Sequence, residues 1–216
     1  VQQRLPSLID PPIAFAHRGA RAYAPENTIE AFQLALRLGA TGLESDVWVT
    51  SDGIAVLDHD GIVRRRGRKI PISEMAQADL PSHIPTVVAM LDAVNGDFDF
   101  SLDVKDPSAL PATLDAVRLV KPELEPRLWL CHHKWQVVAS WRSLTAAKLV
   151  DSTRLSRLKE GPERRAAQLQ KRVGPQSPSN VRGAAQRCAQ SPRVVHQNGQ
   201  HIHRVGRLNC HSCECA

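Results

Sequence analysis

The chain has 216 residues, of which 42% are hydrophobic, and it carries a formal net charge of +6. This length and composition are typical of one globular domain with a sizeable core. No apolar run approaches the roughly 18 residues of a membrane span, and the first residues lack the layout of a secretory signal. We therefore expect a cytoplasmic protein without a membrane span.

The excess of positive over negative charge is confined to one end of the chain. Residues 1–169 contain 21 Lys+Arg and 21 Asp+Glu, so the excess lies in residues 170–216, which also hold four of the five cysteines and no aromatic residue. Such a segment buries too little apolar surface to offset the cost of ordering its backbone, about 1–2 kcal/mol per residue. The composition predicts a folded domain over residues 1–169 and a disordered basic tail over residues 170–216.

The first elements alternate between strand and helix. Residues 13–16 form an apolar run that ends at His17, as in a buried parallel strand. Thr28 is a good N-cap for a helix with a periodic apolar stripe, and Gly39 is suited to end that helix. Residues 42–49 (GLESDVWV) then alternate as a strand does.

The rest of residues 1–169 continues this alternation. After a Ser-Asp-Gly turn at 51–53, residues 54–60 return as an extended segment, and the basic residues 61–82 look like an irregular loop or small insertion. Helices are predicted over residues 85–94, 108–120, 135–144 and 162–169, and strands over residues 98–105, 127–131 and 148–150.

This order of elements predicts the fold class. Strands alternating with helices through short links indicate a parallel α/β sheet. The strands end near His17, Asp46, Lys105, His132 and Asp151. We therefore predict the first five strand–helix units of a (β/α)₈ barrel, which needs about 250 residues when complete.

Two acids on residues 42–49 are candidate metal ligands. Glu44 and Asp46 are two positions apart on a strand, so their side chains point the same way, toward the barrel interior near its C-terminal rim. Two inward carboxylates repel each other and are costly to bury, unless a divalent cation binds them. Oxygen ligands suit Ca²⁺ or Mg²⁺. The alternative is an edge strand with solvated, outward-facing acids.

Asp103 and Lys105 repeat this spacing on the next predicted strand of the barrel. Asp103 is a candidate third metal ligand, and Lys105 would place a cation suited to a phosphate oxygen beside it. A local ion pair at the end of a strand is the alternative.

Two histidines follow apolar strand segments, His17 and His59. Because histidine titrates near neutral pH, the pair could share the roles of general base and general acid. Arg18 offers a planar fork for a phosphodiester, and Gly19 leaves room for a ligand to approach. Each histidine taken alone could instead be structural.

Several motifs together resemble those of the glycerophosphodiester phosphodiesterase family. They are HRG at 17–19, PENT at 25–28, ESDV at 44–47, TSDG at 50–53 and HD at 59–60. The resemblance implies a TIM barrel with a small insertion after its second strand and a Ca²⁺ or Mg²⁺ ion. It assigns the acid–base pair to His17 and His59, metal ligands to Glu44 and Asp46, and phosphate contacts to Arg18 and Lys105. Asp103 stands at a ligand position where the family usually has glutamate.

The implied activity is hydrolysis of a small glycerophosphodiester to sn-glycerol 3-phosphate and an alcohol, with no nucleic-acid partner. Nothing after Leu169 resembles the family's last three strands, which predicts a frame-shifted or truncated member. Its incomplete barrel would have open edges, and we expect it to aggregate and to be weakly active. The alternative function is therefore that of an inactive fragment.

Other residues have weaker signals. His132, His133 and Asp151 are placed to contact the alcohol, although each could be structural. The tail clusters His201, His203, Cys210, His211, Cys213 and Cys215, so zinc binding, or nucleic-acid binding by a basic tail, remains a non-enzymatic alternative.

Overall fold

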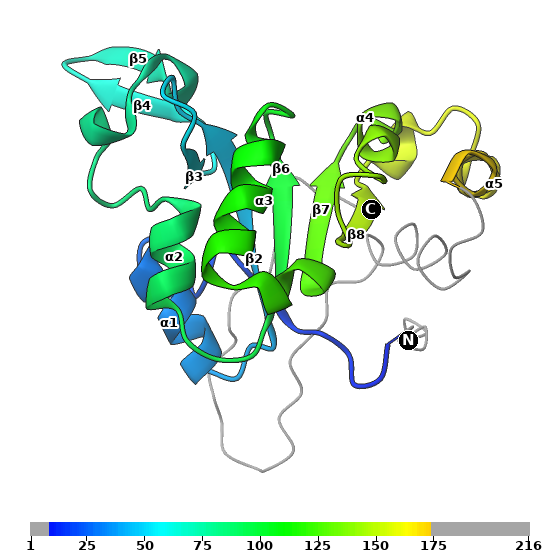
Figure 1. Cartoon of the computed structure of the whole chain (residues 1–216), viewed down its shortest axis with the longest axis horizontal. Helices are drawn as coiled ribbons and strands as arrows, with labels where there is room; N and C mark the ends of the chain where they lie inside the picture. The colour runs from blue at the N-terminus through cyan, green and yellow to red at the C-terminus, as the bar shows by residue number, and fades with distance from the viewer. Residues whose placement is uncertain (1–8, 174–216) are drawn as a thin grey trace.

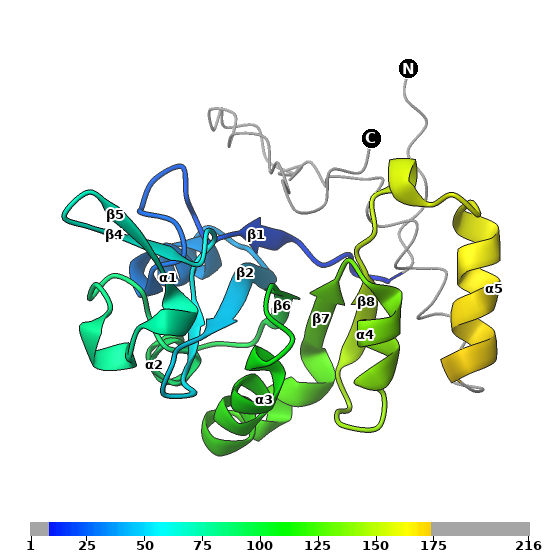
Figure 2. The same cartoon turned by 90° about the horizontal axis from the view of Figure 1, so that it is seen from above.

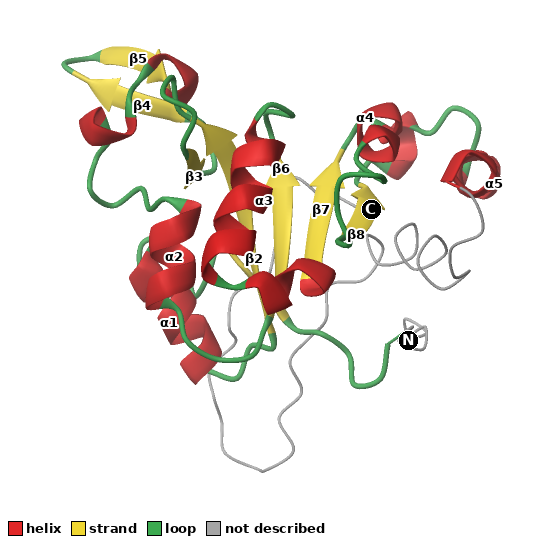
Figure 3. Cartoon of the chain, viewed as in Figure 1, coloured by secondary structure: helices red, strands yellow, loops and turns green. Residues whose placement is uncertain are grey.

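A computed structural model describes residues 9–173. Its main sheet has five parallel strands in the order β1-β2-β6-β7-β8, and β3 pairs antiparallel with β2 (Figures 1 and 3). The bounds are β1 Phe15–His17, β2 Gly42–Val49, β3 Ala55–Leu57, β6 Asp99–Val104, β7 Leu128–His132 and β8 Lys148–Asp151.

Helices α1 to α4 lie between successive parallel strands and α5 follows the last described one, and Figure 2 shows the strands as an open arc with α1, α2 and α3 outside it. Their bounds are α1 Ile29–Arg37, α2 Val87–Ala93, α3 Ala109–Val120, α4 Trp135–Ser140 and α5 Pro162–Val173. Short 3₁₀ helices lie at Ile72–Glu74, Gln77–Asp79, Pro122–Arg127 and Leu155–Arg157. No described helix is long and apolar enough to cross a membrane.

The core fills the space between the sheet and the helices. Phe32 of α1 packs edge-on against Phe100 of β6, with ring centroids 6.4 Å apart, and Phe98 also packs edge-on against Phe100, at 6.3 Å. All three rings are almost fully buried. Burying a side chain of this size stabilises a fold by about 1.5–3 kcal/mol, so these aromatic contacts hold α1 against the strands that end at the site.

The five expected strand–helix units are confirmed, and four of the parallel strands end at or beside the expected residue, whereas β2 runs three residues past Asp46, to Val49. The described strands form an open sheet, and no closed barrel occurs within residues 9–173. The expected disordered tail and its Cys–His cluster lie outside the described residues, apart from the start of that segment in α5.

The expectation of an irregular segment over residues 61–82 is wrong in part. A hairpin of β4 (Ile62–Arg65) and β5 (Arg68–Pro71) projects from the domain there (Figure 1). Its two-residue turn is Arg66–Gly67, both with positive φ, which is the geometry of a tight hairpin. Arginine is not a usual turn residue, so the sequence signal was weak. The expected helix over 135–144 also ends early, at Ser140.

The turn after β1 depends on a glycine. Arg18 and Gly19 adopt left-handed conformations, with φ of 56° and 77°. A Cβ on Gly19 would lie 2.7 Å from the Ala31 carbonyl carbon in α1. The side of Gly19 on which a Cβ would stand is therefore occupied by the helix backbone, so the close approach of α1 is one reason for a glycine here. Thr28 caps α1 as expected, because its hydroxyl accepts a hydrogen bond from the Ala31 amide.

We predict that Gly19→Ala destabilises the fold more than Gly39→Ala does. Both residues have positive φ, which costs a non-glycine residue about 1–2 kcal/mol. A Cβ on Gly39 would meet no atom within 4 Å, whereas one on Gly19 meets α1. Urea unfolding of both variants tests this, and equal destabilisation would mean that the close approach of α1 has no energetic role.

A second prediction concerns pH and Glu125. Hydrogen bonds from Arg118, and further ones from Thr145 and the Ala146 amide, hold the pKa of Glu125 at about 2, below its ordinary 4.5. A depressed folded-state pKa gives stabilisation that is complete above pH 4.5 and is lost as the pH falls toward 2. Glu125→Gln should therefore lower the melting temperature at pH 7 by a few degrees and by much less at pH 3.

The control is Glu123→Gln, on an exposed residue of the same 3₁₀ helix. It should leave the melting temperature unchanged at both pH values. A Glu125→Gln deficit that does not shrink on acidification would contradict the ion-pair account.

Candidate active site

Strand register brings the predicted acids together at the C-terminal ends of β1, β2 and β6. Glu44 lies opposite His17 across the β1–β2 pair, and Asp46 lies opposite Asp103 across the β2–β6 pair. Asp46 is completely buried and Glu44 is 8% exposed, so the alternative of an edge strand with solvated acids is wrong.

Lys105 lies between the two aspartates. Its Nζ is 2.5 Å from Asp103 Oδ2 and 3.0 Å from Asp46 Oδ1. Although burial alone would lower it, the charges of Asp103 and Asp46 raise the pKa of Lys105, which is therefore protonated. The contact with Asp103 is the local ion pair at a strand end that the sequence offered as an alternative. The contact with Asp46 is additional, and through it one ammonium group links β2 to the end of β6.

Asp46 remains poorly compensated despite this contact. Burial raises its pKa, and the charge of Lys105 acts in the opposite direction. Neither carboxylate oxygen accepts a well-directed hydrogen bond from any described residue. A buried carboxylate without such donors is costly, as expected of a group kept for binding or chemistry.

Arg18 is fixed by neighbours on two sides. Its backbone amide donates to Glu44 Oε2 at 3.1 Å, and its Nη1 donates to Glu26 Oε1 at 3.0 Å. Its Nε lies 3.7 Å from Asp46 Oδ2. Sequence analysis gave Glu26 no role, although it belongs to the PENT motif that marked this segment.

Asn27 explains another part of that motif. It adopts a left-handed conformation with φ of 57°, and its Oδ1 accepts a hydrogen bond of 2.7 Å from Ser45 Oγ on β2. Its backbone amide donates to the Arg18 carbonyl at 3.1 Å. The motif therefore ties the segment before α1 to the strand that carries Glu44 and Asp46.

The two histidines occupy the same rim in different surroundings. His17 is buried, with Nε2 3.8 Å from Glu44 Oε2 and Nδ1 3.4 Å from Arg21 Nη1. His59 follows β3, is partly exposed, and has Nδ1 2.7 Å from Asp60 Oδ1. Burial raises the pKa of Asp46, and His59 is among the neighbours that act in the opposite direction, so its ring lies near the buried acids.

The donor chemistry of the rim fits a hard divalent cation. Asp46 offers two buried oxygens, of which Oδ1 lies 3.0 Å from the Lys105 ammonium, and the neighbouring strand positions carry the carboxylates of Glu44 and Asp103. Within residues 9–173, no three His, Cys, Asp or Glu side chains converge closely enough to form a metal shell, and Lys105 lies between the two aspartates. Glu44, Asp46 and Asp103 therefore match such an ion in ligand type, but in this structure the ammonium of Lys105 lies where the two aspartates would share it.

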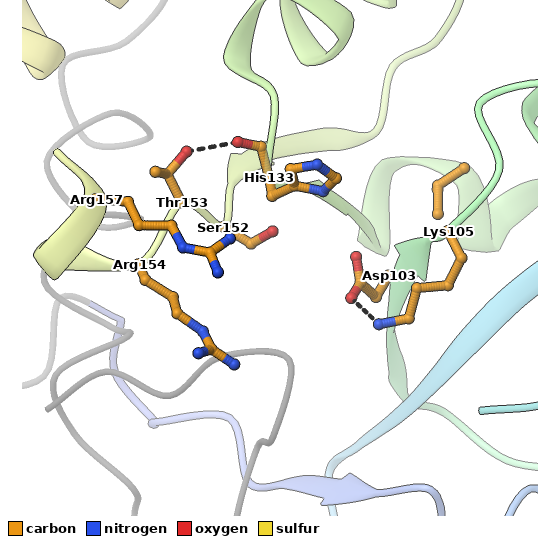
Figure 4. Close-up of a pocket in the computed structure, with 8 residues that line it drawn as sticks. Asp103, Lys105, His133, Ser152, Thr153, Arg154 and Arg157 are labelled. Atoms are coloured by element: carbon orange, nitrogen blue, oxygen red, sulfur yellow. Dashed lines mark hydrogen bonds and ion pairs between the residues drawn. The ribbon is translucent and has the colours of Figure 1, made fainter. Parts of the chain in front are cut away.

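A pocket of about 310 Å³ opens beside this rim at the ends of β6, β7 and β8 (Figure 4). Its lining residues are Asp103, Val104, Lys105, His133, Ser152, Thr153, Arg154 and Arg157. Sequence analysis named neither arginine, although both lie in the segment after the predicted strand 148–150. Their only signal was the spacing TRLSR at residues 153–157, which is unremarkable in a basic protein.

The three residues proposed to contact the alcohol have different surroundings. His133 lines the pocket. His132 is buried against Trp141, accepts a hydrogen bond from the Lys134 amide, and has its pKa lowered by burial. Asp151 forms an ion pair of 2.7 Å with Arg165 and does not line the pocket.

Comparison with known proteins gives consistent relatives. The chain is 56% identical over 52 residues to human glycerophosphodiester phosphodiesterase 1, covering 24% of this chain and 16% of that protein. It is 33% identical over 113 residues to glycerophosphodiester phosphodiesterase of Caldanaerobacter subterraneus, covering 45% and 46%. The chain thus matches less than half the length of these relatives.

A crystal structure of glycerophosphodiester phosphodiesterase from Thermotoga maritima superposes with a TM-score of 0.55 at 26% identity. This match covers 62% of the chain and 60% of the Thermotoga protein, so the open sheet is part of a TIM-type barrel fold. The family model for glycerophosphoryl diester phosphodiesterases matches residues 17–144, from the first candidate histidine to beyond α4. The chain belongs to the glycerophosphoryl diester phosphodiesterase family.

Proposed function

We propose that this chain hydrolyses glycerophosphodiesters to sn-glycerol 3-phosphate and an alcohol, with a divalent cation. The observation that carries the proposal is the contact between Arg18 and the acidic strand β2. One rim holds a fixed guanidinium, a fully buried carboxylate and a histidine. These are the groups that hydrolysis of a phosphodiester needs: an anion site, a general base or acid, and ligands for a cation.

Arg18 and Lys105 supply the phosphate contacts. The Nε and Nη2 atoms of Arg18 are buried and make no hydrogen bond within residues 9–173. Glu26 holds the remaining Nη1, so the guanidinium is already oriented before a ligand binds. A guanidinium presented in this way can donate two parallel hydrogen bonds to phosphodiester oxygens.

His17 and His59 carry the protons. One histidine accepts the proton of the attacking hydroxyl, from water or from the substrate's neighbouring hydroxyl, as its oxygen bonds to phosphorus. The other donates a proton to the alkoxide that leaves as the second phosphorus–oxygen bond breaks. The contact of His17 with Glu44 and that of His59 with Asp60 orient the two rings.

Glu44, Asp46 and Asp103 would hold the Ca²⁺ or Mg²⁺ ion. When ionised, these three carboxylates outnumber the cations Arg18 and Lys105 that contact them, so the rim would repel an anionic phosphodiester. A bound divalent cation reverses that balance and polarises the phosphoryl oxygens. Lys105 would then share Asp46 and Asp103 with the ion.

The second candidate function is that of an inactive chain, which retains the site residues but does not hydrolyse glycerophosphodiesters. The observation that favours it is the open sheet of five parallel strands over residues 9–173. Barrel interiors are filled by layers of side chains from alternate strands, so an open sheet would hold the rim less firmly. Assay of the purified chain on glycerophosphocholine separates the two candidates.

We predict that His17→Ala and His59→Ala each lower kcat by about 10²–10⁴-fold, the usual size of a general acid–base contribution. The double variant should be much less impaired than the product of the two effects, because both residues serve one proton path. Steady-state kinetics on glycerophosphocholine measure this.

His83→Ala is the matched control, because His83 is exposed between β5 and α2. It should retain full turnover. Near-normal turnover of either site variant would remove that histidine from the mechanism.

Metal binding gives a further prediction with a readout besides activity. Ca²⁺ or Mg²⁺ should raise the melting temperature of the chain, because a ligand that binds only the folded state stabilises it. Asp46→Asn should abolish that rise, whereas Asp92→Asn, on an exposed residue of α2, should preserve it.

Turnover should follow the same pattern. Excess chelator should abolish it, and added Ca²⁺ or Mg²⁺ should restore it. Full activity in excess chelator would contradict the metal assignment.

A further inference from the structure

The hairpin of β4 and β5 carries a dense cluster of positive charge at its tip. Five of the six residues at positions 64–69 (RRRGRK) are arginine or lysine, and all of them are exposed. None of the five forms an ion pair with an acidic side chain of residues 9–173. The hairpin therefore presents uncompensated positive charge to the solvent.

These cations are arranged at a cost to the stability of the hairpin. Arg64 lies directly opposite Lys69 and Arg65 opposite Arg68, so both cross-strand pairs consist of like charges, which repel each other. Arg66 in the turn has a φ of 49°, a conformation that disfavours residues with a Cβ. Charged side chains also guard exposed strand edges against pairing, but mixed charges would do so without the repulsion. A cluster of one sign is better explained by an anionic partner.

The base of the hairpin is anchored to the strand that carries the candidate site. Val63 and Ile72 belong to a small buried core beneath the hairpin. The Ile72 amide donates to the Gly61 carbonyl at 2.9 Å, and a Cβ on Gly61 would lie 2.5 Å from the Trp48 ring of β2. Figure 1 shows the hairpin at the end of the domain toward which β6 and β7 run. The cations are therefore held at the same end of the domain as the rim.

The outer face of the hairpin combines cations with an aliphatic side chain. Val63 and Ile70 pair across the two strands and pack in the small core. Because side chains alternate along a strand, Ile62, Arg64 and Lys69 lie on the opposite face. Ile62 is 41% exposed. Cations beside an exposed aliphatic group suit a lipid surface, where the cations contact phosphates and the aliphatic group reaches the boundary of the acyl chains.

We propose that the β4–β5 hairpin docks the chain on membrane surfaces that contain anionic lipids. Each lysine or arginine near such a surface strengthens binding by about fivefold, so several acting together give stable association. Single-stranded nucleic acid is a poorer match, because the hairpin has no aromatic residue on which bases could stack.

Docking would also bring the rim close to lipid. A glycerophosphodiester is what remains of a glycerophospholipid after both acyl chains are removed, so such molecules form at a membrane surface. Docking itself requires no turnover. Its failure would therefore leave the proposed hydrolysis untouched.

Vesicle sedimentation with the whole chain tests the proposal. We expect binding to phosphatidylcholine vesicles that contain about one-third phosphatidylserine, and at least about tenfold weaker binding to phosphatidylcholine alone. Raising NaCl from about 0.1 M to about 0.5 M should weaken the binding by about tenfold, because salt screens exposed charges. Equal binding to both kinds of vesicle, or no binding to either, would overturn the proposal.

A double variant, Arg64→Gln with Lys69→Gln, removes one facing pair from the hairpin. It should weaken vesicle binding by about 25-fold, or fivefold for each residue. Its melting temperature should be unchanged or higher, because a repulsive pair is lost. Lower binding together with undiminished stability would separate docking from a purely structural role.

The matched control is Arg37→Gln with Lys159→Gln. It removes the same two residue types, and thus the same net charge, from exposed positions outside the hairpin. It should lose much less vesicle binding than the hairpin variant does. Equal losses in the two double variants would assign binding to the overall charge of the chain and overturn the proposal.

Two further results separate docking from its alternatives. Hairpin-dependent binding of a short duplex RNA, measured by fluorescence anisotropy, would overturn the proposal if anionic vesicles do not bind, and would assign the surface to nucleic acid. Hairpin-dependent vesicle binding by a chain that does not hydrolyse glycerophosphocholine would support docking and count against the proposed hydrolysis alone.

Discussion

The contact of one ammonium group with two aspartates is the interaction on which the rim depends. Lys105 reaches Asp46 and Asp103 from a position just beyond β6, and the register of β2 and β6 places those aspartates side by side. Asp46 is fully buried, so without Lys105 its charge would be left with the more distant Arg18 guanidinium, at 3.7 Å, as its cationic partner. Replacing a buried ion pair by well-packed apolar residues of similar volume is often neutral or stabilising in proteins. The acids are therefore better explained by binding than by folding.

This constraint accounts for the local structure around it. A buried Asp46 needs cations held close to it. The turn at His17–Gly19 holds one of them, because it fixes Arg18 with its guanidinium beside Asp46. The turn requires Gly19, because α1 lies directly against it, and α1 is in turn fixed by its Thr28 cap and by Phe32 in the core. Arg18 and Asn27 both have a left-handed backbone conformation. They are hydrogen-bonded to each other through the backbone, and each also hydrogen-bonds to a residue of β2. Their strain is thus balanced by contacts with the acidic strand.

Features encoded by local periodicity were predictable from the sequence. The alternation in residues 42–49 identified β2 and the shared face of Glu44 and Asp46, and apolar runs identified the ends of the other parallel strands. Features that depend on contacts between separate segments were missed. Glu26 orients Arg18 across a turn, and the hairpin turn at Arg66–Gly67 contains a residue that is uncommon in such turns. Arg157 lines the same pocket as Lys105, which is far from it in the sequence. A single sequence contains no signal for such pairings, because spacing along the chain does not fix proximity in the fold.

The division of the rim into two parts follows from the order of strands. β1, β2 and β6 carry the candidate chemistry, and the segments after β7 and β8 carry the pocket with its two arginines. Lys105 belongs to both parts, since it contacts Asp46 on one side and lines the pocket on the other. Barrel sheets allow this separation, because each strand end contributes its own loop to a common rim. The strands that bear the acids are thus separate from the segments after β7 and β8 that line the pocket.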